Sequence, residues 1–273
     1  MAPAPQKPTT LLGPEIRDDA PPQYVEEKPL SPEDILQPAT FILRGLEIYT
    51  YPPLPDAIPS YKLSRVIHAQ GPATHAIDIA RVESVTRVSP RTGDLVMSRR
   101  ERELYDLQYW QGLLGGPFVA EAKPHGGNRT LGEMSIARAP RFHRGYRVIK
   151  VLKPEQRASL ERRGGKVKQE WWWRVRHISD GGNGWEWGNA SGDVIARQTA
   201  ADAGEGGSAE HKLEVVEPLP RRTLDSLVSM WCLWMWHLHI DAAARESPKG
   251  WSDVKRIMQK PRDPSLPAQG GFL

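Results

Sequence analysis

The stretch RRTLDSLVSMWCLWMWHLHIDAAARE, residues 221–246, constrains how the rest of the chain can fold. It contains neither proline nor glycine. Thr223 is a residue type that caps helices, and the carboxylate of Asp225 favours a helix start. Apolar residues lie on every side of the expected helix, and a helix that is apolar all round must be buried all round. We therefore predict a buried helix over residues 223–244.

Two surroundings could bury such a helix. A membrane span needs about 20 predominantly apolar residues. The uncharged run here extends only from Ser226 to Ile240 and already contains His237 and His239. This favours burial within protein, inside a barrel made by the preceding strands. A membrane-anchored chain that spans through residues 224–244 is the alternative.

Short stretches rich in β-branched and aromatic residues precede the helix and are separated by turn-forming residues. Residues 145–153 alternate with a period near two, as strands do. About ten strands at this spacing are typical of a sandwich or a closed barrel. Residues 99–109 would also suit a helix, and 154–165 look helical. The expected strands cover 41–51, 61–69, 76–88, 94–109, 117–124, 133–139, 145–153, 168–179, 184–198 and 211–219.

The two ends of the chain differ from this middle part. Residues 1–38 hold nine of the 25 prolines and too little apolar surface to fold alone, so we predict a disordered arm. Residues 247–273 are predicted to be a tail. The single cysteine excludes an intrachain disulfide framework and fits a reducing compartment. No signal-peptide-length apolar run begins the chain, which favours a cytoplasmic protein, with peripheral-membrane or nuclear placement as alternatives.

Four segments of the chain carry a resemblance to a known family. They are WRVRHIS (173–179), WEWGNASGDVIAR (185–197), HKLEVVEPL (211–219) and LDSLVSMWCLWMWHLHIDAA (224–243). These segments resemble the tubby C-terminal-like superfamily, which includes the LURP-one-related proteins and the phospholipid scramblases. They are most similar to uncharacterised tubby-like proteins of fungi, and the resemblance covers residues 40–244. It implies a twelve-stranded antiparallel barrel that encloses the C-terminal helix, as one domain over 39–246.

The resemblance also bears on function. Tubby proteins recognise phosphoinositide headgroups through paired basic residues, but no such pair can be aligned with this chain. Scramblases carry cysteine-rich and calcium-binding segments. This chain departs from that pattern, because it has one cysteine and no acidic calcium loop.

No catalytic or cofactor motif is present. The sequence lacks GxGxxG, GxxxxGK[ST], HExxH and GxSxG patterns. His237 and His239 are two residues apart on the helix and point about 200° away from each other, so they cannot share a metal ion. Cys232 is expected to be buried and inert. We predict no catalytic residue, no cofactor and no metal.

Basic and aromatic residues are the remaining candidates for a binding site. We expect anionic headgroups to bind Arg99, Arg100, Arg102, Arg174 and Arg176. Alternating arginines on strands are also typical of a solvent-facing sheet. The tryptophans at 171–173 could form a platform for a ligand or pack against the helix, and in a regular strand Trp172 points opposite to Trp171 and Trp173.

Together these observations favour a mainly β protein, a closed antiparallel β-barrel of about ten to twelve strands around a buried C-terminal hydrophobic helix. The expected function is a non-catalytic, intracellular binding or scaffold module for anionic lipid headgroups or a protein partner. The net charge of +4 is too mild for a dedicated nucleic-acid binder. The alternatives are a scramblase-like membrane-anchored protein and a hydrolase or transferase with a site at the barrel mouth, where His143, His177 and His211 are the residues to test.

Overall fold

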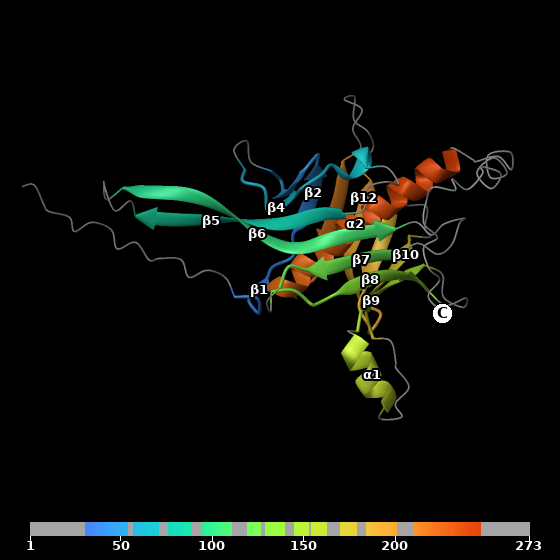
Figure 1. Cartoon of the computed structure of the whole chain (residues 1–273). Helices are drawn as coiled ribbons and strands as arrows, with labels where there is room; N and C mark the ends of the chain where they lie inside the picture. The colour runs from blue at the N-terminus through green and yellow to red at the C-terminus, as the bar shows by residue number, and fades with distance from the viewer. Residues whose placement is uncertain are drawn as a thin grey trace, which may run out of the picture. The chain divides into compact units, whose positions relative to one another are not determined.

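The computed structural model shows a β-barrel closed around one long helix (Figure 1). Strands from β2 to β13 follow one another around the barrel, and every neighbouring pair is antiparallel. The structure describes residues 31–53, 57–70, 76–88, 94–110, 119–126, 129–139, 145–152, 154–162, 170–178, 184–200 and 210–246.

Twelve strands make the barrel, which confirms the predicted fold class. The pairing of β13 with β2 closes it, with Leu213 opposite Phe41. The strands are β2 (Thr40–Arg44), β3 (Glu47–Tyr51), β4 (Tyr61–Leu63), β5 (Ala76–Val88), β6 (Leu95–Trp110), β7 (Val119–Pro124), β8 (Met134–Arg138), β9 (Tyr146–Lys150), β10 (Trp171–His177), β11 (Gly184–Gly188), β12 (Val194–Ala200) and β13 (His211–Val215).

Two of the ten expected strands are hairpins, and this accounts for the difference between ten and twelve. The stretch 41–51 turns at Gly45, which has a φ of +61° that glycine adopts without steric cost. The stretch 184–198 turns between Asn189 and Asp193, where the Asp193 backbone N–H donates to Asn189 Oδ1 at 2.9 Å. Hydrophobic periodicity alone does not mark such tight turns.

The helix α2 (Arg221–Glu246) is the core of the barrel. All its side chains from Leu224 to His237 are buried, as its uniformly apolar sequence predicts. It begins two residues before the predicted cap, so Thr223 lies inside the helix and does not cap it. Strands around the barrel contact it through Tyr61 of β4, Tyr105 of β6, Tyr146 of β9 and Gln198 of β12. Of the helices in the described part of the chain, none is both long enough and apolar enough to cross a membrane.

Smaller elements lie outside the barrel wall. The strand β1 (Ile35–Leu36) pairs with β14 (Leu219–Pro220). It lies within the range 1–38 predicted as a disordered arm, so that prediction is wrong for residues 31–38, whose backbone is held by β14 and by the start of α2. Residues 1–30 are outside the described part. The predicted helical piece is present as α1 (Pro154–Arg162), and a short 3₁₀ helix, η1, covers Ile67–Ala69.

The strands β5 and β6 continue past the barrel as a two-stranded ribbon (Figure 1). β5 pairs with β4 only up to Arg81, and β6 pairs with β7 only from Tyr105 onward. Between Val82 and Val88, β5 therefore pairs only with β6. Since β6 is a strand throughout, the helical alternative for 99–109 is wrong.

Candidate functional site

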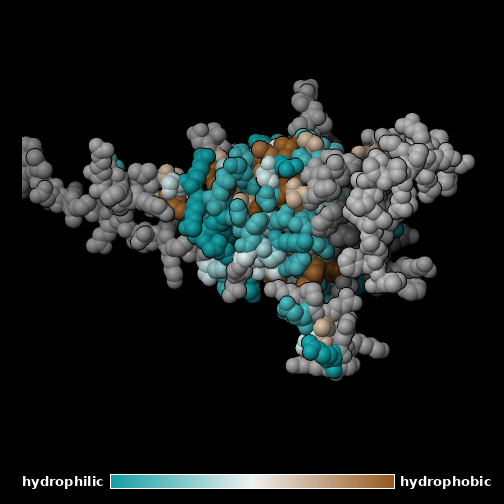
Figure 2. Space-filling view, viewed as in Figure 1, coloured by the Kyte–Doolittle hydropathy of each residue, from teal (hydrophilic) through white to brown (hydrophobic). Residues whose placement is uncertain are grey.

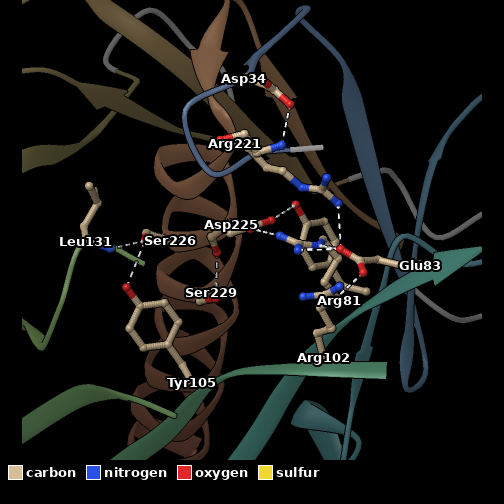
Figure 3. A network of polar contacts seen from close by, with 12 residues as sticks. Asp34, Arg81, Glu83, Arg102, Tyr105, Leu131, Arg221, Asp225, Ser226 and Ser229 are labelled. Carbon is tan, nitrogen blue, oxygen red and sulfur yellow. Dashed lines mark hydrogen bonds and ion pairs between the residues drawn. The ribbon is translucent and has the colours of Figure 1, made fainter. Parts of the chain in front are cut away.

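A buried cluster of charged side chains lies where the ribbon meets the first turns of α2 (Figure 3). The carboxylate of Asp225 is fully buried. It accepts a hydrogen bond of 2.9 Å from the Tyr61 hydroxyl and one from Arg81 Nη1. Burial raises the pKa of Asp225, and this effect outweighs the opposing effects of Arg81, Tyr61 and Arg221.

Glu83 connects the arginines of this cluster. Arg81 Nη2 lies 2.6 Å and Arg221 Nη2 lies 3.1 Å from Glu83 Oε1, and Arg102 Nε contacts Glu83 Oε2. Burial by itself would raise the pKa of Glu83, but the hydrogen bond from Arg81 and the nearby arginine charges outweigh it and lower the pKa. Three arginines therefore surround two carboxylates, and the cluster holds Arg102 in place.

The same turn of α2 is fastened to the barrel by neutral groups (Figure 3). Ser226 Oγ lies 2.8 Å from the Tyr105 hydroxyl and accepts a hydrogen bond of 3.1 Å from the Leu131 backbone N–H. Ser229 Oγ donates to the Asp225 carbonyl at 2.7 Å. Burial raises the pKa of Tyr105 to about 12, so it stays a neutral hydrogen-bonding group. The two contacts of Ser226 fix the helix against β6 and against the connection between β7 and β8.

A cavity of about 600 Å³ opens beside this cluster. It lies over β4, β5 and β6 and the connection between β7 and β8, on a barrel wall that mainly hydrophilic residues cover (Figure 2). Its charged lining residues are Lys62, Asp78, Arg100, Glu101, Arg102, Glu103, His125 and Arg129.

Most of these charges are already paired. Lys62 Nζ lies 2.7 Å from Glu101 Oε1, and Arg102 is held by Glu83. His125 lies between two acids, with Nε2 at 3.5 Å from Asp78 Oδ1 and Nδ1 at 3.6 Å from Glu103 Oε2. Arg100 and Arg129 differ from them. Both are exposed, and neither has an ion-pair partner within the described part of the chain.

The structure separates the arginines that the sequence suggested as one site. Arg100 and Arg102 line the cavity, whereas Arg99 does not. Arg174 and Arg176 lie on β10, and three strands, β7, β8 and β9, separate β10 from β6 in that direction around the barrel. Arg176 is engaged by Glu186, whose Oε2 lies 2.9 Å from Arg176 Nη2.

The cavity also contains residues that the sequence did not suggest. Lys62, His125 and Arg129 come from two separate regions of the chain and follow no motif. Arg129 lies just after the stretch HGGN (125–128), whose glycines match no phosphate-loop pattern. The pairing of β4 with β5, of β5 with β6 and of β6 with β7 brings these side chains to the same wall as Arg100.

The tryptophans mostly pack in the core. Trp173 and Trp187 are buried, and the ring of Trp185 lies 4.8 Å from that of Trp234. The prediction that Trp171 and Trp173 share a face is wrong, because the register of β10 against β9 shifts between them. Trp171 instead lies beside two arginines, with the guanidinium carbons of Arg147 and Arg174 at 5.3 and 5.8 Å from its ring centre.

Of the histidines proposed for a catalytic site, the two that are described, His177 and His211, lie on different strands. His177, at the end of β10, makes an edge contact with Trp185, with ring centres 5.2 Å apart, whereas His211 is on β13. Burial lowers the pKa of His211, and the nearby His68 and His239 lower it further. His143 lies outside the described residues. Within the described ranges, no three histidine, cysteine or acidic side chains are placed to hold a metal ion.

Cys232 cannot act as a nucleophile in the folded protein. Its side chain is fully buried on α2, and burial raises the pKa of its thiol far above the ordinary value.

Comparisons of the chain with models of protein families, with curated proteins and with solved structures found no match.

Proposed function

We propose that this chain is a non-catalytic binding module of the tubby-like type, and that the cavity over β4, β5 and β6 recognises anionic lipid headgroups. The observation that carries the proposal is the presence of Arg100 and Arg129 on a cavity of about 600 Å³ with no carboxylate paired to either, among the residues described. Two unpaired cations at a concave site attract phosphate, and arginine binds phosphate oxygens in a bidentate geometry.

The size and the mixed lining of the cavity suit a headgroup. Its volume lies within the range of about 300–1,000 Å³ that is usual for small-molecule sites. Arginines supply donors for phosphate oxygens, and the nearby Glu101, Glu103 and Asp78 supply acceptors for hydroxyl groups. A phosphorylated polyol contains both kinds of group, whereas a purely apolar ligand would leave the charged lining without partners.

The ribbon next to the cavity favours a membrane as the source of the headgroup. Met97 is 66% exposed and Leu95 is 44% exposed, and both lie near the tip of β6. Arg99 follows on the same face of the strand, because side chains alternate with a period of two. Exposed apolar side chains beside cations are typical of surfaces that bind anionic bilayers.

Co-sedimentation with liposomes tests this proposal. The full chain should pellet with vesicles that contain anionic lipid and not with neutral ones, and less protein should pellet at high salt. The variant R100Q/R129Q should bind roughly 30-fold more weakly, since each arginine near an anionic surface contributes about 1 kcal/mol.

The matched control is R44Q. Arg44 of β2 is also an exposed strand arginine, but it is paired with Glu210 at 2.8 Å and does not line the cavity. This variant should bind as the wild type does. Equal binding by R100Q/R129Q and the wild type, or binding that does not respond to salt, would contradict the proposal.

A further inference from the structure

Two arginines lie directly opposite each other on the outer wall of the barrel, on strands that do not contribute to the cavity. Arg147 of β9 pairs in register with Arg174 of β10. Their neighbours Val148 and Val175 are buried in the core, so the arginine side chains point outward. Like charges directly opposite on neighbouring strands destabilise a sheet.

No acid in the described part of the chain compensates this pair. Among the described residues, neither Arg147 nor Arg174 makes a hydrogen bond or an ion pair. The Nε atoms of both are buried without an acceptor. The terminal nitrogens are not among the buried unpaired atoms, so they are open to solvent. The next arginine along β10 differs, since Arg176 is bound by Glu186 at 3.0 and 2.9 Å.

Trp171 holds both guanidinium groups. Their central carbons lie 5.3 and 5.8 Å from its ring centre, within the usual range for a cation–π contact. This contact orients the two groups but leaves their positive charges unneutralised. On the other side of Arg174 the facing residue is Gly188, which has no side chain, and a small hollow of about 20 Å³ lies there.

We infer that Arg147, Arg174 and Trp171 form a binding site for a phosphoryl dianion. Two guanidinium groups match the two negative charges of a phosphomonoester or of inorganic phosphate, and they can donate to its oxygens in pairs. A bound dianion would also remove the repulsion between the arginines. The phosphoryl group could belong to a soluble ligand or to a lipid headgroup. The inference is independent of the proposed cavity, because β7 and β8 lie between β6 and β9.

Thermal unfolding of the full chain tests this site with inorganic phosphate as the probe. Phosphate at several times its Kd should raise the Tm of the wild type by roughly 2–4 °C over sodium chloride of equal ionic strength. The variants R147Q and R174Q should lose this rise. In chloride, each should unfold at the wild-type temperature or above it, because the substitution removes the repulsion. If either arginine had a purely structural role, its substitution would instead lower the Tm in chloride.

Matched controls separate this site from the cavity. R176Q removes an arginine that Glu186 already pairs, so it should keep the phosphate response, and R100Q/R129Q should keep it as well. Vesicles with and without phosphatidate, which carries a phosphomonoester, form the lipid arm. If the wild type responds only to the vesicles that contain phosphatidate, and R174Q abolishes this response, the source of the phosphoryl group is a lipid. The inference is overturned if neither phosphate nor phosphatidate vesicles act on the wild type, or if R174Q responds as the wild type does.

Discussion

The buried pair Arg81 and Asp225 allows a sharp prediction about stability. Arg81→Met keeps most of the side-chain volume but leaves Asp225, which is fully buried, with the Tyr61 hydroxyl at 2.9 Å as its remaining side-chain hydrogen-bond donor. Removing one partner of a buried ion pair costs about 3–5 kcal/mol. Asp225→Asn should cost less, about 1–3 kcal/mol, because Arg81 keeps Glu83 at 2.6 Å.

The assay is urea unfolding at several pH values. The control is R176M, because Arg176 forms an ion pair at the surface. Its loss should change the free energy of unfolding by less than about 1 kcal/mol. Burial raises the pKa of Asp225, and loss of Arg81, which opposes that effect, raises it further. The folded state then binds the proton more tightly than the unfolded state does. The penalty of R81M must therefore shrink as the pH falls from neutral through the raised pKa. Two results would refute the reasoning. One is a decrease in the free energy of unfolding of R81M that stays constant with pH, and the other is a decrease equal to that of D225N.

Further predictions concern the core and one turn. Trp234→Ala, at a fully buried position on α2, should lower the free energy of unfolding by about 3–5 kcal/mol in chemical denaturation, and a loss below 1 kcal/mol would contradict the enclosed helix. Gly145→Ala should lower the Tm more than Gly126→Ala does. Both glycines have positive φ, but a Cβ at 145 would lie 2.4 Å from the Val175 carbonyl oxygen, whereas one at 126 meets nothing within 4 Å. Cys232, the only cysteine, should not react with a thiol reagent until the protein unfolds, and rapid labelling of the native protein would show that the barrel opens.

The candidate sites show the limit of sequence reasoning more clearly than the fold does. Arginines on β6 and β10 could be identified as candidates from their position on alternating strands. Whether each one is free depended on which acid of a neighbouring strand reaches it. Glu83 engages Arg102, and Glu186 engages Arg176, so of the five candidate arginines Arg99, Arg100 and Arg174 have no carboxylate partner among the described residues. Arg176 lies opposite Glu186 in register, whereas Glu83 lies opposite Arg100 and engages Arg102 diagonally, a choice that composition does not reveal.

The sequence by itself determined that a helix apolar on every face had to be enclosed, and that short alternating strands had to enclose it. Burial of apolar surface depends on the composition of the segment, and that can be read without knowing its neighbours. The tertiary structure alone decided that Arg147 faces Arg174 and that Trp171 lies beside both rather than on the face of Trp173. The physical reason is that side chains alternate along a strand, so one irregular position in the pairing moves a side chain to the other face.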